Sequence, residues 1–130
     1  TLKTIREKGF KTALISDCSG EVPLIWDATP FGPLFDATVF SCVAGIKKPD
    51  PRIYRMATDP LGVRPEDCLY IGDGSSTELT GARAVGMHAV QIQDPDEKIN
   101  AEYVQREENW DGDRISCLSE VLPMLGETDI

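Results

Sequence analysis

Short apolar runs alternate with amphipathic stretches along most of this chain. Continuous apolar runs that end in polar residues are typical of strands buried in a parallel sheet. Such runs predict strands at residues 11–16, 35–41, 68–71, 88–92 and 115–117. Amphipathic stretches bounded by glycine or proline predict helices. These helices are expected at residues 2–8, 21–28, 78–85 and 118–125, and the polar residues 93–112 are expected to be irregular with a short helix.

One further helix has the clearest start and stop signals in the chain. Asp50 can cap its first turn, and Pro51 suits its first position, where no backbone donor is needed. Pro60 and Gly62 are expected to end it. The residues expected on its buried face are Ile53, Met56 and Ala57.

The alternation of strands and helices predicts the fold class. It indicates an α/β domain, a Rossmann-like three-layer α/β/α sandwich around a parallel sheet. The length of 130 residues suggests one domain. Ligands in such folds bind at the carboxyl ends of the strands. Three predicted strand ends are followed by polar residues suited to chemistry, namely Ser16-Asp17, Lys47-Lys48 and Asp73.

Charge and cysteine content narrow the functional classes. The chain has 22 acidic and 13 basic residues, a formal charge of −9, and nucleic-acid binding is not expected because it depends on clustered Lys and Arg. With one histidine and no Cys-x-x-Cys pair, the chain is not expected to hold zinc. We expect reduced, mostly buried thiols in a cytoplasmic protein, with no membrane association. The four cysteines are Cys18, Cys42, Cys68 and Cys117.

Asp73 and Glu78 form a predicted metal site. Asp73 directly follows the apolar run 69–71 between two glycines, and Glu78 comes five residues later, at the start of a predicted helix. Two carboxylates at a strand end favour a hard cation such as Mg²⁺. The alternative for Asp73 is a loop acid that caps the following turn. The alternative for Glu78 is a capping box, since Ser75-x-x-Glu78 matches that pattern.

Ser16 and Lys48 are the predicted anion-binding residues. The Ser16 hydroxyl can donate to a phosphate oxygen beside the free N–H groups of its turn, although a lone serine there is most often a turn residue. Lys48, held by the proline that follows it, can direct a fixed positive charge at an anion, although lysine pairs are usually solvated. A serine nucleophile is disfavoured, because the single histidine, His88, begins a strand away from the expected ligand end. The Gly-rich stretch lacks both the dinucleotide and the P-loop patterns.

Three stretches together resemble a known family. ALISDCS, GIKKPDPRIY and YIGDGSSTELTGA, in this order, are similar to three of the four motifs of the haloacid dehalogenase-like hydrolase superfamily. The similarity is closest to its phosphatase branch with an early-inserted cap, the phosphoglycolate phosphatase-like proteins. It covers residues 1–92 of what would be one partial core domain, with residues 93–130 as a C-terminal segment.

The resemblance implies a role for each residue singled out above. Ser16 matches the residue that hydrogen-bonds the transferring phosphoryl group, and Lys48 matches the lysine that balances its charge; both are expected to be catalytic. Asp17, where many relatives have Asn, is expected in substrate binding with them. Asp73 matches the Mg²⁺-binding acid. Glu78 matches a second acid, more usually Asp, so its direct contact with the metal is left open.

The family's first motif, a strand that ends in Asp-x-Asp with the nucleophile first, is not found at its expected place. Asp94-Pro95-Asp96 and Asp111-Gly112-Asp113 have the letters but come after the other motifs, and we expect both to be solvated loops. We therefore expect a missing N-terminal segment that carries the nucleophile, the cap and a central strand between residues 11–16 and 68–71. The opening TLKTIREKGF, which resembles a helix already begun, fits a shortened N-terminus.

The expected function is that of a Mg²⁺-dependent phosphatase acting on a small phosphorylated metabolite through an aspartyl phosphate, with this chain inactive by itself. One alternative is a phosphate- or metal-binding module or inactive fragment without turnover. Another is a phosphomutase or a phosphonate-cleaving enzyme of the same superfamily. The two-acid motif argues against true dehalogenases, which resemble this fold but use no magnesium.

Overall fold

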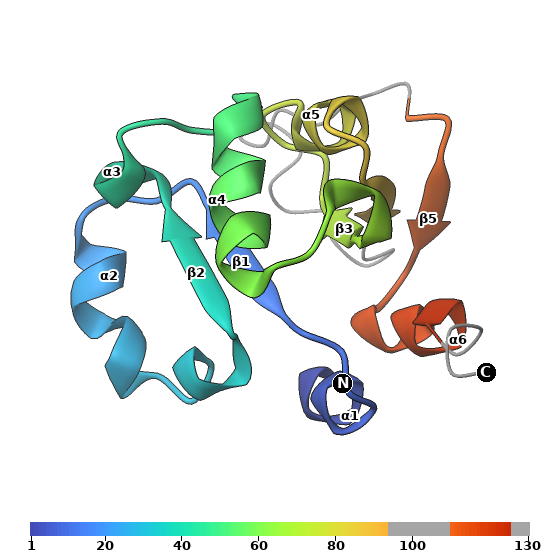
Figure 1. Ribbon diagram of the computed structural model, residues 1–130, viewed down its shortest axis with the longest axis horizontal. Helices are drawn as coiled ribbons and strands as arrows, with labels where there is room; N and C mark the ends of the chain where they lie inside the picture. The colour runs from blue at the N-terminus through green and yellow to red at the C-terminus, as the bar shows by residue number, and fades with distance from the viewer. Residues whose placement is uncertain (94–109, 126–130) are drawn as a thin grey trace.

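The computed structural model describes residues 1–93 and 110–125, and its strands and helices alternate along the chain (Figure 1). The strands are β1 (Ala13–Ser16), β2 (Ala37–Phe40), β3 (Leu69–Gly72), β4 (His88–Ile92) and β5 (Asp113–Ile115). The helices are α1 (Leu2–Glu7), α2 (Glu21–Ile25), α3 (Ser41–Ala44), α4 (Pro51–Leu61), α5 (Glu78–Ala84) and α6 (Val121–Leu125). Four single 3₁₀ turns, η1 (Trp26–Ala28), η2 (Gly32–Leu34), η3 (Pro65–Asp67) and η4 (Leu118–Glu120), complete the described elements.

The described strands form two parallel sheets. One contains β1 and β2, with Ser16 opposite Phe40 as the last pair. The other has the order β3-β4-β5, with Leu69 opposite His88 as the first pair of β3 and β4. The predicted α/β fold with parallel strands is confirmed. The strands of residues 1–93 and 110–125 do not join into one sheet, and the interruption lies between β1 and β3.

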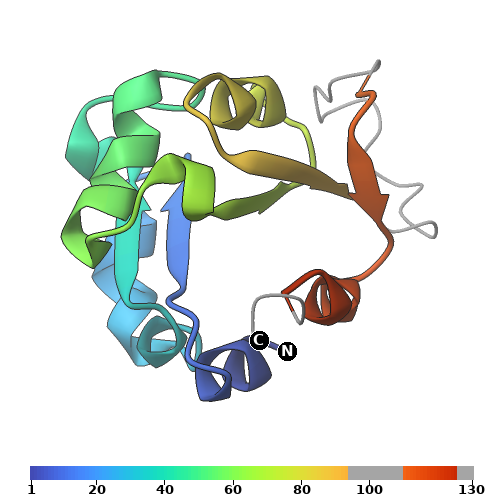
Figure 2. The ribbon, with the colours of Figure 1, turned by 45° about the vertical axis from the view of Figure 1, so that its right-hand side comes forward.

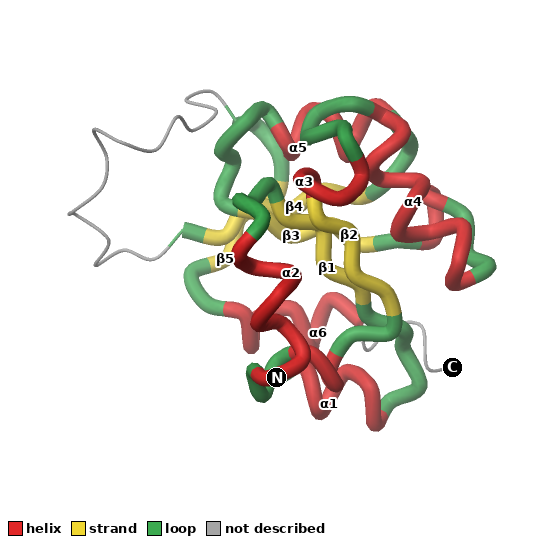
Figure 3. The backbone as a smooth tube through the Cα atoms, turned by 90° about the vertical axis from the view of Figure 1, so that its left-hand side faces the viewer, coloured by secondary structure: helices red, strands yellow, loops and turns green. Residues whose placement is uncertain are grey.

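Helices cover both faces of the β3-β4-β5 sheet (Figures 2 and 3). Ala89 of β4 belongs to a core cluster that α4 and α5 share with both sheets. The next residue, Val90, belongs to a second cluster on the opposite face, with residues of α1, β5 and α6. Successive side chains of a strand point to opposite faces, so β4 contributes to both cores. The result is a three-layer arrangement of the described elements.

Helix α4 begins as predicted, and the predicted burial is confirmed for Ile53 and Ala57 but not for Met56. The Asp50 carboxylate accepts a hydrogen bond from the Arg52 N–H at 2.9 Å, and Gly62 ends the helix in the left-handed region, with φ +67°. Met56 is 42% exposed, contrary to the prediction that it is buried. The buried residues of α4 are Ile53, Tyr54, Ala57 and Thr58. Tyr54 is buried where Met56 was expected to be, and its hydroxyl donates a hydrogen bond to the carbonyl of Glu78 in α5.

Strand β1 is shorter and more open than predicted. It begins at Ala13 because the polar groups of Thr12 are already used: its N–H donates to Asp36 Oδ2 at 2.8 Å, and its carbonyl accepts from the Asp36 N–H at 2.7 Å. The predicted burial of this strand is wrong for all four of its residues, which are exposed or half-buried. The described strands pair with β1 on the β2 side only, which accounts for this exposure.

The cysteines differ from the expected buried thiols. Cys42 and Cys117 are exposed, Cys18 and Cys68 are half-buried, and all four are free thiols. No helix in the described part of the chain is long and apolar enough to cross a membrane. Most of the predicted irregular segment, including Asp94-Pro95-Asp96, lies outside the described residues.

Candidate functional site

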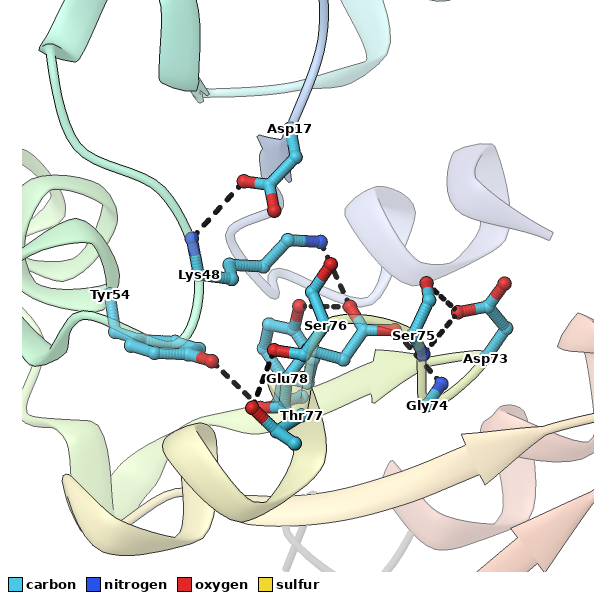
Figure 4. A network of polar contacts seen from close by, with 10 residues as sticks. Asp17, Lys48, Tyr54, Asp73, Gly74, Ser75, Ser76, Thr77 and Glu78 are labelled. Carbon is cyan, nitrogen blue, oxygen red and sulfur yellow. Dashed lines mark hydrogen bonds and ion pairs between the residues drawn. The ribbon is translucent and has the colours of Figure 1, made fainter. Parts of the chain in front are cut away.

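Three segments that are far apart in sequence meet beyond the ends of β1 and β3 (Figure 4). Asp17 follows β1, Lys48 precedes α4, and Glu78 begins α5. Asp17 Oδ1 accepts a hydrogen bond from the Lys48 backbone N–H at 3.1 Å. Lys48 Nζ in turn donates to Glu78 Oε1 at 2.9 Å. The structure thus brings together three of the five residues predicted for the site.

Glu78 is the buried centre of this network. Its side chain is 4% exposed, and that of Lys48 is 12% exposed. Oε1 also accepts from the Tyr70 hydroxyl at 2.6 Å, and Oε2 accepts from the Gly74 N–H at 2.9 Å. A buried carboxylate is tolerated when a cation and further donors surround it, as they do here. Glu78 therefore fixes the Lys48 ammonium in one position.

Two tyrosines that the sequence analysis did not single out support Glu78. Their rings meet edge to face, with centroids 5.5 Å apart. The Tyr54 hydroxyl donates to the Glu78 carbonyl at 2.7 Å, while that of Tyr70 donates to the Glu78 carboxylate. Burial, and next the Glu78 charge, raise the pKa of Tyr70, so its hydroxyl remains a donor. A tyrosine near the end of a buried strand, next to an acidic motif, is a weak signal that sequence reasoning can use.

Glycines provide the space for this arrangement. A Cβ at Gly72 would lie 2.5 Å from Glu78 Cδ and 2.6 Å and 2.7 Å from the two carboxylate oxygens. A Cβ at Gly81 would lie 2.5 Å from the Tyr54 hydroxyl and 2.7 Å from Pro49 Cβ. Because such separations are not tolerated, Gly72 lets β3 approach the Glu78 side chain, and Gly81 lets α5 approach Tyr54 and Pro49.

Asp73 lies beside the network and is held by its own turn. Its Oδ1 accepts from the Ser75 N–H at 2.9 Å and from the Ser75 hydroxyl at 2.6 Å. Its carbonyl accepts from Gln91 Nε2 at 3.1 Å. These bonds orient Asp73 while Ser76 and Thr77 take positive φ values of 59° and 50°. Such values are strained for residues other than glycine, especially a β-branched one.

The capping-box alternative for Glu78 is wrong. Thr77 is the residue that precedes α5, and Glu78 is its first residue. The Ser75 hydroxyl donates to Asp73, and the Glu78 carboxylate accepts from the Gly74 N–H and not from that of Ser75. Glu78 therefore serves the Lys48 network instead of the helix start.

Ser16 is the last residue of β1, one residue before Asp17, and is half-buried. It thus lies at the strand end that carries the site. His88 is the first residue of β4, at the opposite end of its sheet, where it contacts Asp113 Oδ2 at 2.7 Å. Asp111 is exposed and pairs with Arg83, and Asp113 begins β5. Asp111-Gly112-Asp113 therefore leads into a strand, and the expected loop is wrong for Asp113, whereas the family's Asp-x-Asp motif is expected to end a strand.

Only some of the side chains at the candidate site are suited to binding a hard cation such as Mg²⁺. Asp73 offers a carboxylate, a ligand type that Mg²⁺ prefers, and Mg²⁺ commonly takes one or two protein carboxylates together with waters and phosphate. Both Glu78 oxygens are already engaged by Lys48, Tyr70 and Gly74. Residues 1–93 and 110–125 contain no group of three or more metal-ligating side chains. Asp73 stays a predicted ligand of such an ion, and its Oδ1 already accepts two hydrogen bonds from Ser75.

Sequence comparison identifies the family. A family model described as haloacid dehalogenase-like hydrolase matches residues 1–86. The chain belongs to the haloacid dehalogenase-like hydrolases. It is 35% identical over 96 residues to haloacid dehalogenase-like hydrolase domain-containing protein 3 of Bos taurus, over 74% of the chain and 38% of that relative. It is also 35% identical over 95 residues to a glyceraldehyde 3-phosphate phosphatase of Methanopyrus kandleri, over 71% of the chain and 40% of that enzyme.

Structure comparison agrees with the family assignment. The haloacid dehalogenase-like chain matches the crystal structure of a HAD phosphatase from Thermococcus onnurineus with a TM-score of 0.80 and 27% identity. The match covers 96% of the chain and 54% of that structure. The chain thus spans less than half the length of the two curated relatives and about half of this structure. It is a partial core domain of this family, whose members generally use Mg²⁺.

Proposed function

We propose that this chain is the phosphate-binding part of a Mg²⁺-dependent phosphatase that acts on a small phosphorylated metabolite. The observation that carries the proposal is the fixed position of Lys48: Glu78 binds its ammonium, and the Asp17 carboxylate accepts from its backbone N–H. A preorganised cation stabilises the charge that develops on a transferring phosphoryl group and costs no reorganisation during the reaction. The phosphatases among the relatives support this substrate class.

Ser16 and Asp17 have different roles in the proposed site. Ser16 donates its hydroxyl to a phosphoryl oxygen from the end of β1. Asp17 is negatively charged and would repel a phosphate in direct contact. Its bond to the Lys48 N–H supports a positioning role for Asp17 in substrate binding, through the lysine segment.

Asp73 is the proposed ligand of Mg²⁺, and Glu78 positions Lys48. Glu78 would have to give up buried bonds to Lys48, Tyr70 and Gly74 in order to contact a metal. When bound, Mg²⁺ would neutralise charge on the phosphoryl oxygens. The turn bonds from Ser75 hold the Asp73 carboxylate for this purpose.

The nucleophile is proposed to lie on a further strand outside these 130 residues, between β1 and β3. The separate sheets support this proposal, because the described strands leave one edge of β1 and one edge of β3 without a hydrogen-bonded neighbour. An aspartate at the end of such a strand would attack phosphorus and form the aspartyl phosphate. A cap domain is proposed to belong to the same absent part.

Phosphate binding tests the Lys48 assignment. We expect Lys48→Met to weaken the binding of inorganic phosphate, measured by calorimetry in the presence of Mg²⁺, by about tenfold or more, the value of one charge-assisted hydrogen bond. Lys47→Met is the matched control, because Lys47 is an exposed neighbour with the same charge. Equal weakening by both substitutions, or normal binding by Lys48→Met, would contradict the assignment.

A loss of folding must be separated from a loss of binding. Lys48→Met leaves the buried Glu78 charge without its cation, which costs about 3 to 5 kcal/mol of stability. The double variant Lys48→Met with Glu78→Gln removes both charges and should recover most of that stability. It should still bind phosphate weakly, which identifies Lys48 as a ligand and not merely as a structural cation.

Turnover separates the phosphatase from the alternative of a binding module. The alternative is favoured by one observation: the only Asp-x-Asp in the described residues, Asp111-Gly112-Asp113, lies at the start of a strand and not at its end. We expect the 130-residue chain to release no phosphate from p-nitrophenyl phosphate with Mg²⁺, and the chain extended by its upstream coding region to do so. A 2-haloacid serves as the control substrate. Turnover by the 130 residues alone would refute the missing nucleophile, and inactivity of both would favour the module.

A further inference from the structure

Cys18 and Cys42 face each other just beyond the paired strands β1 and β2. The last pair of these parallel strands is Ser16 with Phe40, and each cysteine lies two residues further along its own segment. Cys18 lies in the turn that follows β1, and Cys42 lies in the single turn of α3 that follows β2. The two sulfur atoms are 3.8 Å apart.

Hydrogen bonds around the two thiols keep the segments together. The Cys18 N–H donates to the Ser41 hydroxyl at 3.0 Å, and the Cys42 thiol donates to the Ser19 carbonyl at 3.5 Å. Cys42 is exposed and Cys18 is half-buried, so a small oxidant can reach the pair. These bonds hold the turn after β1 against α3.

The other two cysteines have different surroundings. Cys68 donates to the Arg64 carbonyl at 3.3 Å, and Cys117 lies 3.1 Å from the Ser119 hydroxyl. Cys18 and Cys42 are therefore the pair that the fold prepares for bond formation.

We propose that Cys18 and Cys42 are a redox modification site that closes to an intrachain disulfide when the protein meets a peroxide. One thiolate attacks a peroxide oxygen, the O–O bond breaks, and a sulfenic acid and one water result. The other thiol attacks the sulfenic sulfur, the S–S bond forms, the S–OH bond breaks, and a second water leaves. Two protons and two electrons pass from the thiols, and one peroxide becomes two waters.

Exposure sets the order of the two steps. Burial, and next the neighbouring Cys42 thiol, raise the pKa of Cys18, so less of it is thiolate at neutral pH. The exposed Cys42 is therefore oxidised first, and Cys18 resolves the sulfenic acid. The sulfur atoms must approach from 3.8 Å to the bonded distance of about 2.0 Å, a movement that the turn after β1 and the single turn of α3 can accommodate.

The proposed disulfide lies next to the candidate functional site. Cys18 directly follows Asp17, which accepts from the Lys48 N–H, and lies two residues after Ser16. A disulfide would tie this turn to α3. The proposed modification itself does not depend on the phosphatase proposal, and its test uses no substrate.

Peptide mapping tests the proposal directly. The reduced 130-residue chain is treated with equimolar hydrogen peroxide, and the remaining thiols are blocked with N-ethylmaleimide after unfolding. Trypsin leaves Cys18 and Cys42 on one peptide, because no Lys or Arg lies between Lys11 and Lys47. Cleavage after glutamates separates them at Glu21 and places each of the four cysteines on its own peptide. We expect a linked pair that joins the Cys18 and Cys42 peptides, two blocked thiols, and recovery of all four thiols with dithiothreitol.

Serine variants provide the controls. Cys18→Ser and Cys42→Ser should each abolish the link, whereas Cys117→Ser, which removes the other exposed thiol, should retain it. The same oxidation in guanidinium should distribute links among all pairs, which shows that the preference comes from the fold. A link that involves Cys68 or Cys117, a dimer linked between chains, a stable higher oxide of Cys42, or four unreacted thiols would each overturn the proposal.

Discussion

Gly72 is the residue on which the geometry of Glu78 depends most directly. An added methyl group would meet the Glu78 carboxyl at 2.5 to 2.7 Å. We expect Gly72→Ala to lower the free energy of unfolding by about 1 to 3 kcal/mol, the usual cost of overpacking, and to displace the partner of Lys48. Chemical denaturation and phosphate calorimetry measure the two effects.

The control for Gly72 is Gly20→Ala. A Cβ at Gly20 would meet nothing within 4 Å, and its φ of −62° suits any residue. This change should alter stability by about 0.5 kcal/mol or less, as exposed substitutions usually do. A Gly72→Ala variant as stable as the Gly20→Ala variant would mean that Glu78 can move away without loss.

At the scale of elements, α4 depends on the Asp50 carboxylate at its start. The Arg52 side chain and then the Arg52 N–H, as donors, lower the pKa of Asp50 from its ordinary 3.8 to about 2. Between these values the unfolded chain binds more protons than the folded chain, so stability rises with pH there. The contribution of the cap is therefore complete above pH 4 and is lost as the pH falls through about 2.

Substitutions at the helix start check this pH dependence. Asp50→Ala should destabilise α4 at neutral pH and remove the loss between pH 4 and 2, whereas Asp50→Asn keeps an acceptor and should be milder. Asp59→Ala, on the exposed side of the same helix, removes one carboxylate without removing the cap. Amide exchange in α4 reports the result. An acid loss that persists in Asp50→Ala would assign it to another carboxylate.

The elements that the sequence predicted well are those with local signals. Asp50-Pro51 and Gly62 set the ends of α4, and β4 has the predicted bounds His88–Ile92. The buried face of α4 was predicted less well, because Tyr54 is buried through a bond to Glu78, a residue 24 positions away. No residue close to Tyr54 in the sequence indicates this partner. The single turn α3 was missed, although Gly45 beyond it, with φ +77°, is a recognisable stop.

In the candidate site, too, features with local sequence signals were predicted and features that depend on distant contacts were not. Strand ends and motif spacing were enough to select Asp17, Lys48 and Glu78, which the structure joins by hydrogen bonds. Sequence could not show that Glu78 is buried, or that Tyr70 and Gly74 saturate its oxygens. Those facts depend on how β3 and α5 pack, and they change the proposed role of Glu78 from metal ligand to support for Lys48.

At the scale of the molecule, the two sheets are joined by helices and not by strand pairing. Helices α4 and α5 share one core with residues of both sheets, such as Val39 of β2 and Ala89 of β4. The Lys48–Glu78 pair crosses the same boundary. The candidate site therefore lies where the two halves meet, and its geometry depends on their remaining in register.

The edges of β1 and β3 lead to a prediction about the whole fold. In a parallel sheet, successive residues direct their N–H groups to opposite neighbours. Val90 and Gln91 of β4 are paired with both β3 and β5, whereas β1 and β3 have a described neighbour on one side only. We expect hydrogen exchange to be slow at both Val90 and Gln91 and to alternate between slow and fast in β1 and β3.

Uniform protection in β1 and β3 would contradict this expectation and would mean that a further strand occupies both edges. Unpaired edges readily accept another chain, so sedimentation velocity at several concentrations must accompany the exchange measurement. Protection that disappears on dilution would identify a second copy as the strand donor. Protection that persists in the monomer would identify a segment of the same chain, and the proposed position of the missing nucleophile strand would then be wrong. Alternating exchange in a monomer leaves that position open for the strand that the proposed catalysis requires.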